Sequence, residues 1–147
     1  MRYFLYVVAL AILVYPFWGI VAPQSYLVEL LETYPLAKQA NSSQIKLAAG
    51  QLLISNVAFA FAIFLLAKFI QFPQQYYRAK YAAILFICYP FMLSLVEALN
   101  SAVLYEGVDG AHFVVELSAM KLFYIVFGII IIGVYQSQRK LSSVPQD

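Results

Sequence analysis

Charge is scarce in this sequence. Only 11% of its 147 residues are Asp, Glu, Lys or Arg, and 64% are hydrophobic, whereas a soluble domain is about 25% charged and about 45–50% apolar. The nine basic and seven acidic side chains leave a net charge of +2, too small for steering by total charge. This composition excludes a soluble globular protein, a disordered chain and a nucleic-acid-binding protein. It predicts an integral membrane protein whose first partner is the lipid bilayer.

Reactive side chains are equally scarce. Cys88 is the single cysteine and His112 the single histidine, which excludes an intramolecular disulfide and a cysteine zinc cluster. The sequence has no Gly-rich phosphate loop, no GxSxG and no HExxH motif, so a nucleophile would have no evident base. We therefore expect a protein without enzymatic activity or cofactor.

One group of residues raises the question of a metal. His112 and Glu116 are four residues apart, close to Asp109, and would share one face of a helix. Such a set is able to hold a divalent ion. An acidic turn followed by a histidine at a helix start is nevertheless common without any metal, and the sequence predicts no metal site.

The abundant feature is the long hydrophobic run. A span needs about 20 helical residues to cross about 30 Å of hydrocarbon, and four stretches qualify: Tyr3–Ala22, Leu47–Ile70, Tyr81–Tyr105 and Phe113–Tyr135. They predict an all-α fold, a polytopic four-transmembrane-helix bundle in which residues 1–147 form a single domain. The first stretch exceeds the usual apolar region of a signal peptide, so we expect a retained anchor. Pro16 and Pro90 are expected to kink their helices.

Basic residues predict the orientation of the bundle. Six lie on one side of it, and only Lys38 and Lys46 lie in the loops of the other, with Lys121 inside the membrane. Because Lys and Arg collect in cytoplasmic loops, both termini are expected to be cytoplasmic. The six are Arg2, Lys68, Arg78, Lys80, Arg139 and Lys140.

The outer loop after the first span contains an amphipathic segment over Ser25–Tyr34. Leu27, Leu30, Leu31 and Tyr34 recur at helical spacing, and Pro35 is expected to end the helix. These four residues are candidates for an interface. Two interpretations stay open: a helix lying flat in the outer interface, or one that docks on a partner.

Several polar residues lie inside the predicted spans, where each charge costs about 2.5–3.5 kcal/mol on insertion scales. They form a layer in the outer half of the bundle, made of Glu97, Lys121, Asn56, Asn100, Glu116 and Gln51. Because the inner half is almost purely apolar, a continuous polar pathway is not expected.

Two of these residues are placed at equal depth by the hairpin. Glu97 lies 12 residues before Asp109 and Lys121 lies 12 after it. The leading hypothesis is a structural pair that holds the hairpin in register. The alternatives are a proton or ligand site at Glu97, and a Lys121 side chain that extends towards the interface.

The second half of the chain carries two further motifs: Phe72-Pro73-Gln74-Gln75-Tyr76-Tyr77 between the second and third spans, and Tyr135-Gln136-Ser137-Gln138-Arg139-Lys140 after the fourth. In these motifs, over about residues 44–144, the chain resembles the small bacterial inner-membrane proteins grouped as domain of unknown function 2569. The resemblance implies four spans and a location in the inner (plasma) membrane, and it implies no activity.

Two functions remain open. The leading hypothesis is a non-catalytic accessory or regulatory subunit of a larger inner-membrane complex, with other membrane-protein subunits as partners. The alternative is a small oligomeric proton-coupled transporter that uses Glu97. Four-helix exporters resemble one another in having an acid within the first helix, and Tyr3–Ala22 has none.

Overall fold

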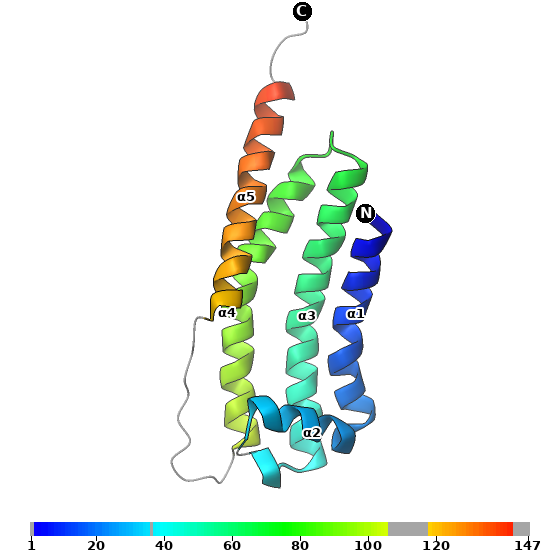
Figure 1. Ribbon diagram of the computed structural model, residues 1–147, viewed down its shortest axis with the longest axis vertical. Helices are drawn as coiled ribbons and strands as arrows, with labels where there is room; N and C mark the ends of the chain where they lie inside the picture. The colour runs from blue at the N-terminus through cyan, green and yellow to red at the C-terminus, as the bar shows by residue number, and fades with distance from the viewer. Residues whose placement is uncertain (1, 36, 106–117, 143–147) are drawn as a thin grey trace, which may run out of the picture. The chain divides into compact units, whose positions relative to one another are not determined.

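The computed structural model describes residues 2–35, 37–105 and 118–142. In this part of the chain every regular element is helical (Figure 1). The elements follow one another as α1 (Arg2–Val21), α2 (Pro23–Thr33), the short 3-10 helix η1 (Ala37–Gln39), α3 (Ser42–Gln71), α4 (Tyr77–Leu104) and α5 (Ala119–Ser142).

Four of these helices are long and apolar enough to cross a membrane, over Tyr3–Val21, Ser42–Gln71, Tyr77–Leu104 and Ala119–Leu141. The predicted all-α bundle with four membrane spans is therefore confirmed, and the chain is a multi-pass membrane protein. The first three helix boundaries agree with the prediction to within five residues at each end. The predicted start of the last span, at Phe113, lies outside the described residues.

Among the first three spans, the largest difference from the prediction is the start of α3, five residues before the predicted Leu47. The reason is a pair of reciprocal hydrogen bonds at the helix start. Asn41 Oδ1 accepts from the Gln44 amide at 2.9 Å, and Gln44 Oε1 accepts from the Asn41 amide at 2.8 Å. Such a capping box satisfies two backbone donors that the helix leaves unpaired, so the helix begins at Ser42, ahead of the hydrophobic run.

The end of the last membrane span also differs from its predicted position. Helix α5 continues seven residues beyond the predicted Tyr135, to Ser142. Gln, Arg and Lys are good helix formers in water, and Arg139 and Lys140 in the last turn complement the negative end of the helix dipole. The helix therefore extends past its hydrophobic part.

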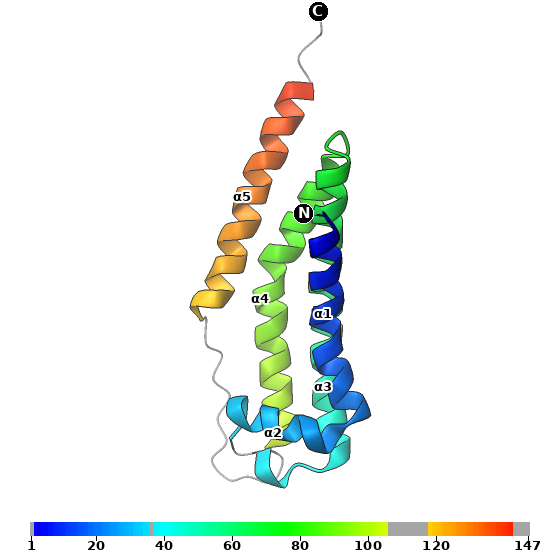
Figure 2. The ribbon, with the colours of Figure 1, turned by 45° about the vertical axis from the view of Figure 1, so that its right-hand side comes forward.

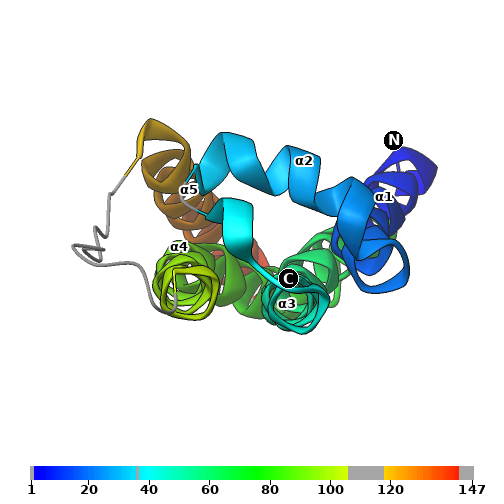
Figure 3. The same cartoon turned by 90° about the horizontal axis from the view of Figure 1, so that it is seen from below.

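Helix α2 forms where the amphipathic segment predicts it. Pro23 occupies the first turn, where its missing N–H costs nothing. The helix ends at Thr33 because Pro35 restricts the residue before it, and Tyr34 has φ −124° and ψ 75°. The Tyr34 amide still donates to the Leu30 carbonyl at 2.7 Å. In Figures 2 and 3 α2 runs crosswise to the adjoining ends of α1, α3 and α4.

The single domain stays a prediction. By their contacts the described residues group into two compact units, and each unit is described by itself. Unit 1 is defined by residues 2–10, 58–90 and 118–142, and unit 2 by residues 11–35, 37–57 and 91–105. Three boundaries between the units fall within α1, α3 and α4.

Unit 1 has an aromatic core between α3, α4 and α5. Phe59 stacks on Tyr89 with ring centroids 4.3 Å apart and meets Tyr124 edge-on at 5.1 Å. Phe86 meets Phe127 edge-on at 5.0 Å. Aromatic pairs of this geometry add about 0.5–1.5 kcal/mol beyond the burial of their area.

Small residues bring α4 and α5 of unit 1 close together. A Cβ atom added to Gly128 would lie 2.6 Å from Ile87 Cγ1 and 2.9 Å from the Ala83 carbonyl oxygen. Glycine is therefore required for this approach, as is common between helices in membranes. Ala62 of α3, another small residue of unit 1, is fully buried.

The two units differ in charge. Every charged residue in the described part of unit 1 is basic, whereas unit 2 holds Glu29, Glu32 and Glu97 together with Lys38 and Lys46. The basic residues of unit 1 fall at the start of α1, the end of α3, the start of α4 and the end of α5, apart from Lys121 at the start of α5. This segregation is the pattern from which the orientation was predicted.

Candidate functional site

The core of unit 2 lies under α2. It consists of Tyr26, Leu30, Tyr34, Ala37, Ile45, Ala48, Ala49 and Leu104. Leu30 is 5% exposed, and Leu27 and Leu31 are partly buried against this core. The apolar face that was expected to meet lipid or a partner is therefore packed against the chain itself, because α3 and α4 present small and apolar side chains beneath it.

Tyr26 is the central residue of this packing and is fully buried. It fits because Gly19 of α1 has no side chain: an added Cβ would lie 2.6 Å from the Tyr26 ring and 2.7 Å from Ala49 Cβ. The Tyr26 ring lies 5.0 Å from the Tyr15 ring and 6.2 Å from Trp18, centroid to centroid. Three aromatic side chains are thus gathered at the junction of α1 and α2.

The Tyr26 hydroxyl is a buried polar group without a hydrogen-bond partner among the described residues. Burial raises the pKa of this phenol well above its usual range, and the neighbouring Tyr15 raises it further. Leaving a buried polar group unpaired costs about 1–3 kcal/mol. A water molecule or a ligand group that bonds this hydroxyl would recover that free energy.

Tyr34 joins the end of α2 to α4. The Asn100 amide donates a hydrogen bond to its phenol oxygen, and its ring meets Tyr105 edge-on at 6.2 Å. Burial raises the pKa of Tyr34, the Asn100 hydrogen bond opposes this shift, and the Glu97 charge adds to it. Tyr34 therefore stays neutral, and its neighbourhood includes the Glu97 carboxyl group.

These residues enclose a cavity of about 160 Å³ inside unit 2. Its polar lining is Glu97 and Asn100 from α4, Tyr15 from α1, and Tyr26, Thr33 and Tyr34 from α2 and its end. Its apolar lining is Leu30, Leu52, Leu93 and Val96. Asn100 is 3% exposed, and its Oδ1 has no hydrogen-bond partner among the described residues. This cavity is the candidate functional site.

A second cavity of unit 2, of about 220 Å³, is almost wholly apolar. It is lined by Gln51, Ile54, Ser55, Met92, Leu95, Val96 and Leu99. The Ser55 hydroxyl donates to the Leu52 carbonyl of its own helix at 2.9 Å. Gln51 Oε1 is buried and has no partner in the part of the chain that the structure describes.

Asn56 has a structural role. Its Nδ2 donates to the Ile12 carbonyl of α1 at 3.0 Å. That carbonyl would ordinarily accept from the residue four positions later, but position 16 is a proline and has no N–H. Asn56 therefore supplies the hydrogen bond that Pro16 removes, a known way to tolerate proline in a membrane helix.

The residues of the predicted polar layer lie in different surroundings in the structure. Glu97 and Asn100 share one cavity, Gln51 lines another, and Asn56 serves the α1 backbone. Lys121 lies in unit 1, 4% exposed, in the first turn of α5. Glu116, with Asp109 and His112, lies outside the described residues. The Glu97–Lys121 pair stays a prediction, because the two residues belong to different units.

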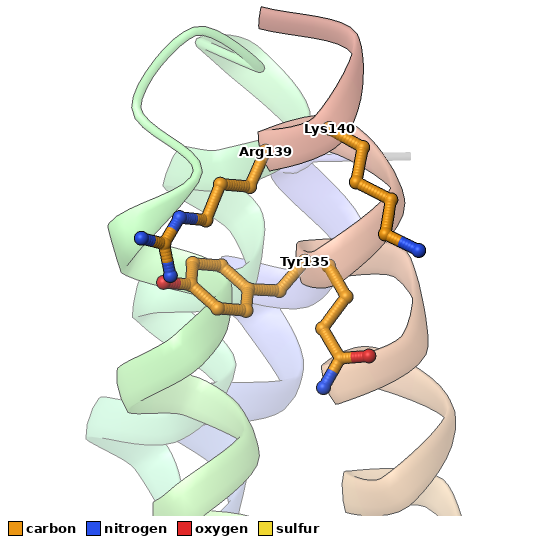
Figure 4. A pocket seen from close by; sticks show the side chains of 4 residues that line it. Tyr135, Arg139 and Lys140 are labelled. Carbon is orange, nitrogen blue, oxygen red and sulfur yellow. The ribbon is translucent and has the colours of Figure 1, made fainter. Parts of the chain in front are cut away.

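Unit 1 has a basic surface hollow at the end of α5, lined by Tyr135, Gln136, Arg139 and Lys140. The Tyr135 ring and the Arg139 side chain extend to one side of the helix and Lys140 to the other (Figure 4). Tyr135 also lies 5.8 Å from the Tyr76 ring. Tyrosine and basic side chains together are typical of a membrane–water interface.

Among the described residues, no three His, Cys, Asp or Glu side chains lie together so that they could hold a metal ion. The side chains that line the cavity offer hydrogen bonding, charge and aromatic faces. No family model matches the chain, and neither a curated protein nor a solved structure is similar to it.

The sequence identified Glu97, Asn100 and Tyr34 but did not identify Tyr15 and Tyr26 as lining residues. Tyr26 lies on the apolar stripe of α2. Its position under the helix depends on Gly19, which precedes it by seven residues on another helix. A glycine in the last turn of an apolar helix, followed by a proline and an aromatic residue, is the sequence feature that could have indicated this packing.

Proposed function

We propose that this protein is a non-catalytic accessory or regulatory subunit of a larger complex in the inner (plasma) membrane of a bacterium. The observation that supports the proposal is that only a small fraction of the residues of α5 is buried. Only 17% of its most apolar window is buried, against 44% for α3. A helix that packs so little against its own chain offers most of its side-chain surface to lipid or to other membrane proteins.

The exposed part of α5 contains a position suited to a neighbouring helix. Gly133 is exposed, and an added Cβ would meet nothing within 4 Å, whereas Gly128 is packed against α4. Exposed Ile129, Ile130 and Val134 surround it. Glycines allow close approach of helices in membranes, and we assign this part of α5 to a transmembrane helix of the partner subunit.

The test is copurification of the tagged full-length protein in a mild detergent. We expect a larger complex of fixed composition, which Gly133→Leu breaks and Gly50→Leu leaves intact. Gly50 is a matched control, because an added Cβ there also meets nothing within 4 Å. A protein that purifies alone, or a complex that is insensitive to Gly133→Leu, would contradict the proposal.

The second candidate is a small oligomeric proton-coupled transporter. It is favoured by the position of Glu97, an ionisable group in a membrane helix that lines a cavity beside Asn100 and Tyr34. A homo-oligomer whose pH-driven uptake in vesicles is abolished by Glu97→Gln would support it. The distribution of polar groups weighs against it, since the described core of unit 1 is aromatic.

A further inference from the structure

Two hollows of unit 1 lie at the end of α5. The first, of about 470 Å³, is the basic hollow, lined by Tyr135, Gln136, Arg139 and Lys140. The second, of about 350 Å³, is lined by Pro73, Gln74, Tyr76, Gln138 and Leu141. The two charged side chains in the described lining of the basic hollow are both cations, whereas the described lining of the second hollow is uncharged. The basic hollow is therefore suited to a negatively charged group.

The side chains of the basic hollow supply three kinds of hydrogen-bond donor. Tyr135 and Arg139 extend to one side of α5 and Lys140 to the other (Figure 4). A guanidinium group binds a phosphate through two parallel N–H bonds, an ammonium group binds it as a compact charge, and a phenol adds a neutral donor. Arg139 and Lys140 each have several N–H groups, so a contact with another part of the chain leaves further donors for a ligand.

The helix and its neighbour hold the phenol and the guanidinium group together. Tyr135 precedes Arg139 by four residues in α5, so the two side chains share one face of the helix. The Tyr135 ring also lies 5.8 Å from the ring of Tyr76, which directly precedes α4. The donor set is thus anchored to the segment between α3 and α4.

The position of the basic hollow along α5 matches the depth of lipid phosphates. The apolar run of α5 ends at Tyr135, and Arg139 follows one turn later, about 6 Å further along the axis at about 1.5 Å per residue. The headgroup layer on each side of the hydrocarbon is about 5–8 Å thick. With Tyr135 at the edge of the hydrocarbon, where tyrosine is enriched, Arg139 and Lys140 lie within the headgroup layer.

We propose that the basic hollow binds the phosphate group of an anionic glycerophospholipid. Basic side chains at the end of a membrane helix favour such headgroups. A free phosphate ester has the same chemistry, and the depth of the hollow favours the lipid. A volume of about 470 Å³ equals that of about 16 water molecules at about 30 Å³ each, which leaves room for a phosphate with its attached glycerol. The assignment goes beyond the proposed function and does not depend on it.

The test is a lipid titration of the full-length protein in detergent, read by native mass spectrometry. Phosphatidylglycerol is compared with phosphatidylcholine, in which the choline cation balances the phosphate. We expect one molecule of phosphatidylglycerol to bind at least tenfold more tightly than phosphatidylcholine. The third ligand is glycerol 3-phosphate, a soluble phosphate ester without acyl chains, and we expect it to bind at least tenfold more weakly than phosphatidylglycerol.

Substitutions inside and outside the lining locate the site. Arg139→Gln and Lys140→Gln are each expected to raise the Kd for phosphatidylglycerol at least fivefold. Arg139→Lys keeps the charge but lacks the planar fork, and we expect a smaller rise. Lys80→Gln removes the same charge as Lys140→Gln from an exposed position of unit 1 outside the lining, and we expect an unchanged Kd. Glutamine is a good helix former, and circular dichroism shows whether each variant is folded.

Three results would overturn the proposal. Equal affinities of the wild-type protein for phosphatidylglycerol and phosphatidylcholine would show that the hollow does not select an anionic headgroup. Equal effects of Lys80→Gln and Lys140→Gln would show that binding follows the total basic charge and not this hollow. Glycerol 3-phosphate binding as tightly as phosphatidylglycerol would identify a soluble phosphate ester, and not a lipid, as the ligand.

Discussion

Asn56 illustrates why a polar side chain inside a membrane helix need not mark a functional site. It donates to the Ile12 carbonyl, the group that Pro16 deprives of its helical partner. The Asn56 side chain of α3 therefore replaces the backbone amide that α1 lacks at position 16. Asn100 differs from it, because its Oδ1 faces no described partner and lines a cavity. The two asparagine side chains have the same chemistry, but Asn56 stabilises a helix backbone whereas Asn100 lines a cavity.

This role of Asn56 predicts a coupled mutant cycle. Asn56→Leu leaves the Ile12 carbonyl without a donor and should lower the free energy of unfolding by about 1–3 kcal/mol. Pro16→Ala restores the amide at position 16, so the double substitution Pro16→Ala/Asn56→Leu should lose much less than the sum of the single changes. Thermal unfolding of the four proteins in one detergent measures this coupling. Additive losses would show that Asn56 acts elsewhere.

Tyr34 predicts how stability responds to alkaline pH. Burial raises its pKa above the value of about 10 expected in the unfolded chain. Its contribution to stability is therefore complete below about pH 10 and is lost as the pH rises through the folded-state pKa. Tyr34→Phe cannot ionise, so its stability should decline less steeply above pH 10 than that of the wild-type protein.

The readout for Tyr34 is the slope of unfolding free energy against pH, because the variant also loses its hydrogen bond with Asn100 and starts from a lower stability. Tyr77→Phe, at a half-exposed position, is the control for removing one of the 12 tyrosines. A Tyr34→Phe slope equal to that of Tyr77→Phe would contradict the prediction.

The helices of this protein pack through small residues, and the glycines show where. Gly19 admits the Tyr26 ring in unit 2, and Gly128 admits Ile87 and the Ala83 carbonyl in unit 1, whereas Gly50 and Gly133 have open space around them. Two of these four glycines therefore allow close packing and two have open space, and the sequence alone does not distinguish the two kinds.

Gly128→Ala should accordingly destabilise the protein, because the new methyl group would overlap Ile87 Cγ1 at 2.6 Å. Overpacking of this kind typically costs about 1–3 kcal/mol. Gly133→Ala adds the same methyl group in open space and should leave the melting temperature of the isolated protein in detergent unchanged or slightly raised. Equal melting temperatures for the two variants would show that the α4–α5 contact is looser than described.

The sequence predicted whole helices better than their ends and packing. Hydrophobic runs located all four spans, and Pro23 and Pro35 bounded α2 within two residues. The start of α3 was placed too late, since Asn41 and Gln44 are polar and hydropathy ignores their reciprocal hydrogen bonds. The lining of the cavity by Tyr15 and Tyr26 was not predicted, because it depends on contacts between helices that no local pattern encodes.

Across the whole molecule, the described basic and acidic residues occupy different parts of the membrane-spanning helices. The described basic residues of unit 1 all lie in the first or last turn of a helix, and the described acids all belong to unit 2. Because basic loops are retained in the cytoplasm, reporter fusions at Asp147 should give a cytoplasmic signal and fusions at Ser43 an external one. An external reporter at Asp147 would reverse the predicted orientation and place the cavity of unit 2 on the cytoplasmic side.

The last prediction concerns Glu97 and Lys121, whose equal spacing from Asp109 predicts equal depth in a symmetric hairpin. If they pair, Glu97→Leu or Lys121→Leu alone strands the remaining charge in hydrocarbon, and breaking a buried pair typically costs about 3–5 kcal/mol. The double substitution leaves no unpaired charge and should recover most of the lost melting temperature in detergent. A double mutant less stable than either single would contradict the pairing.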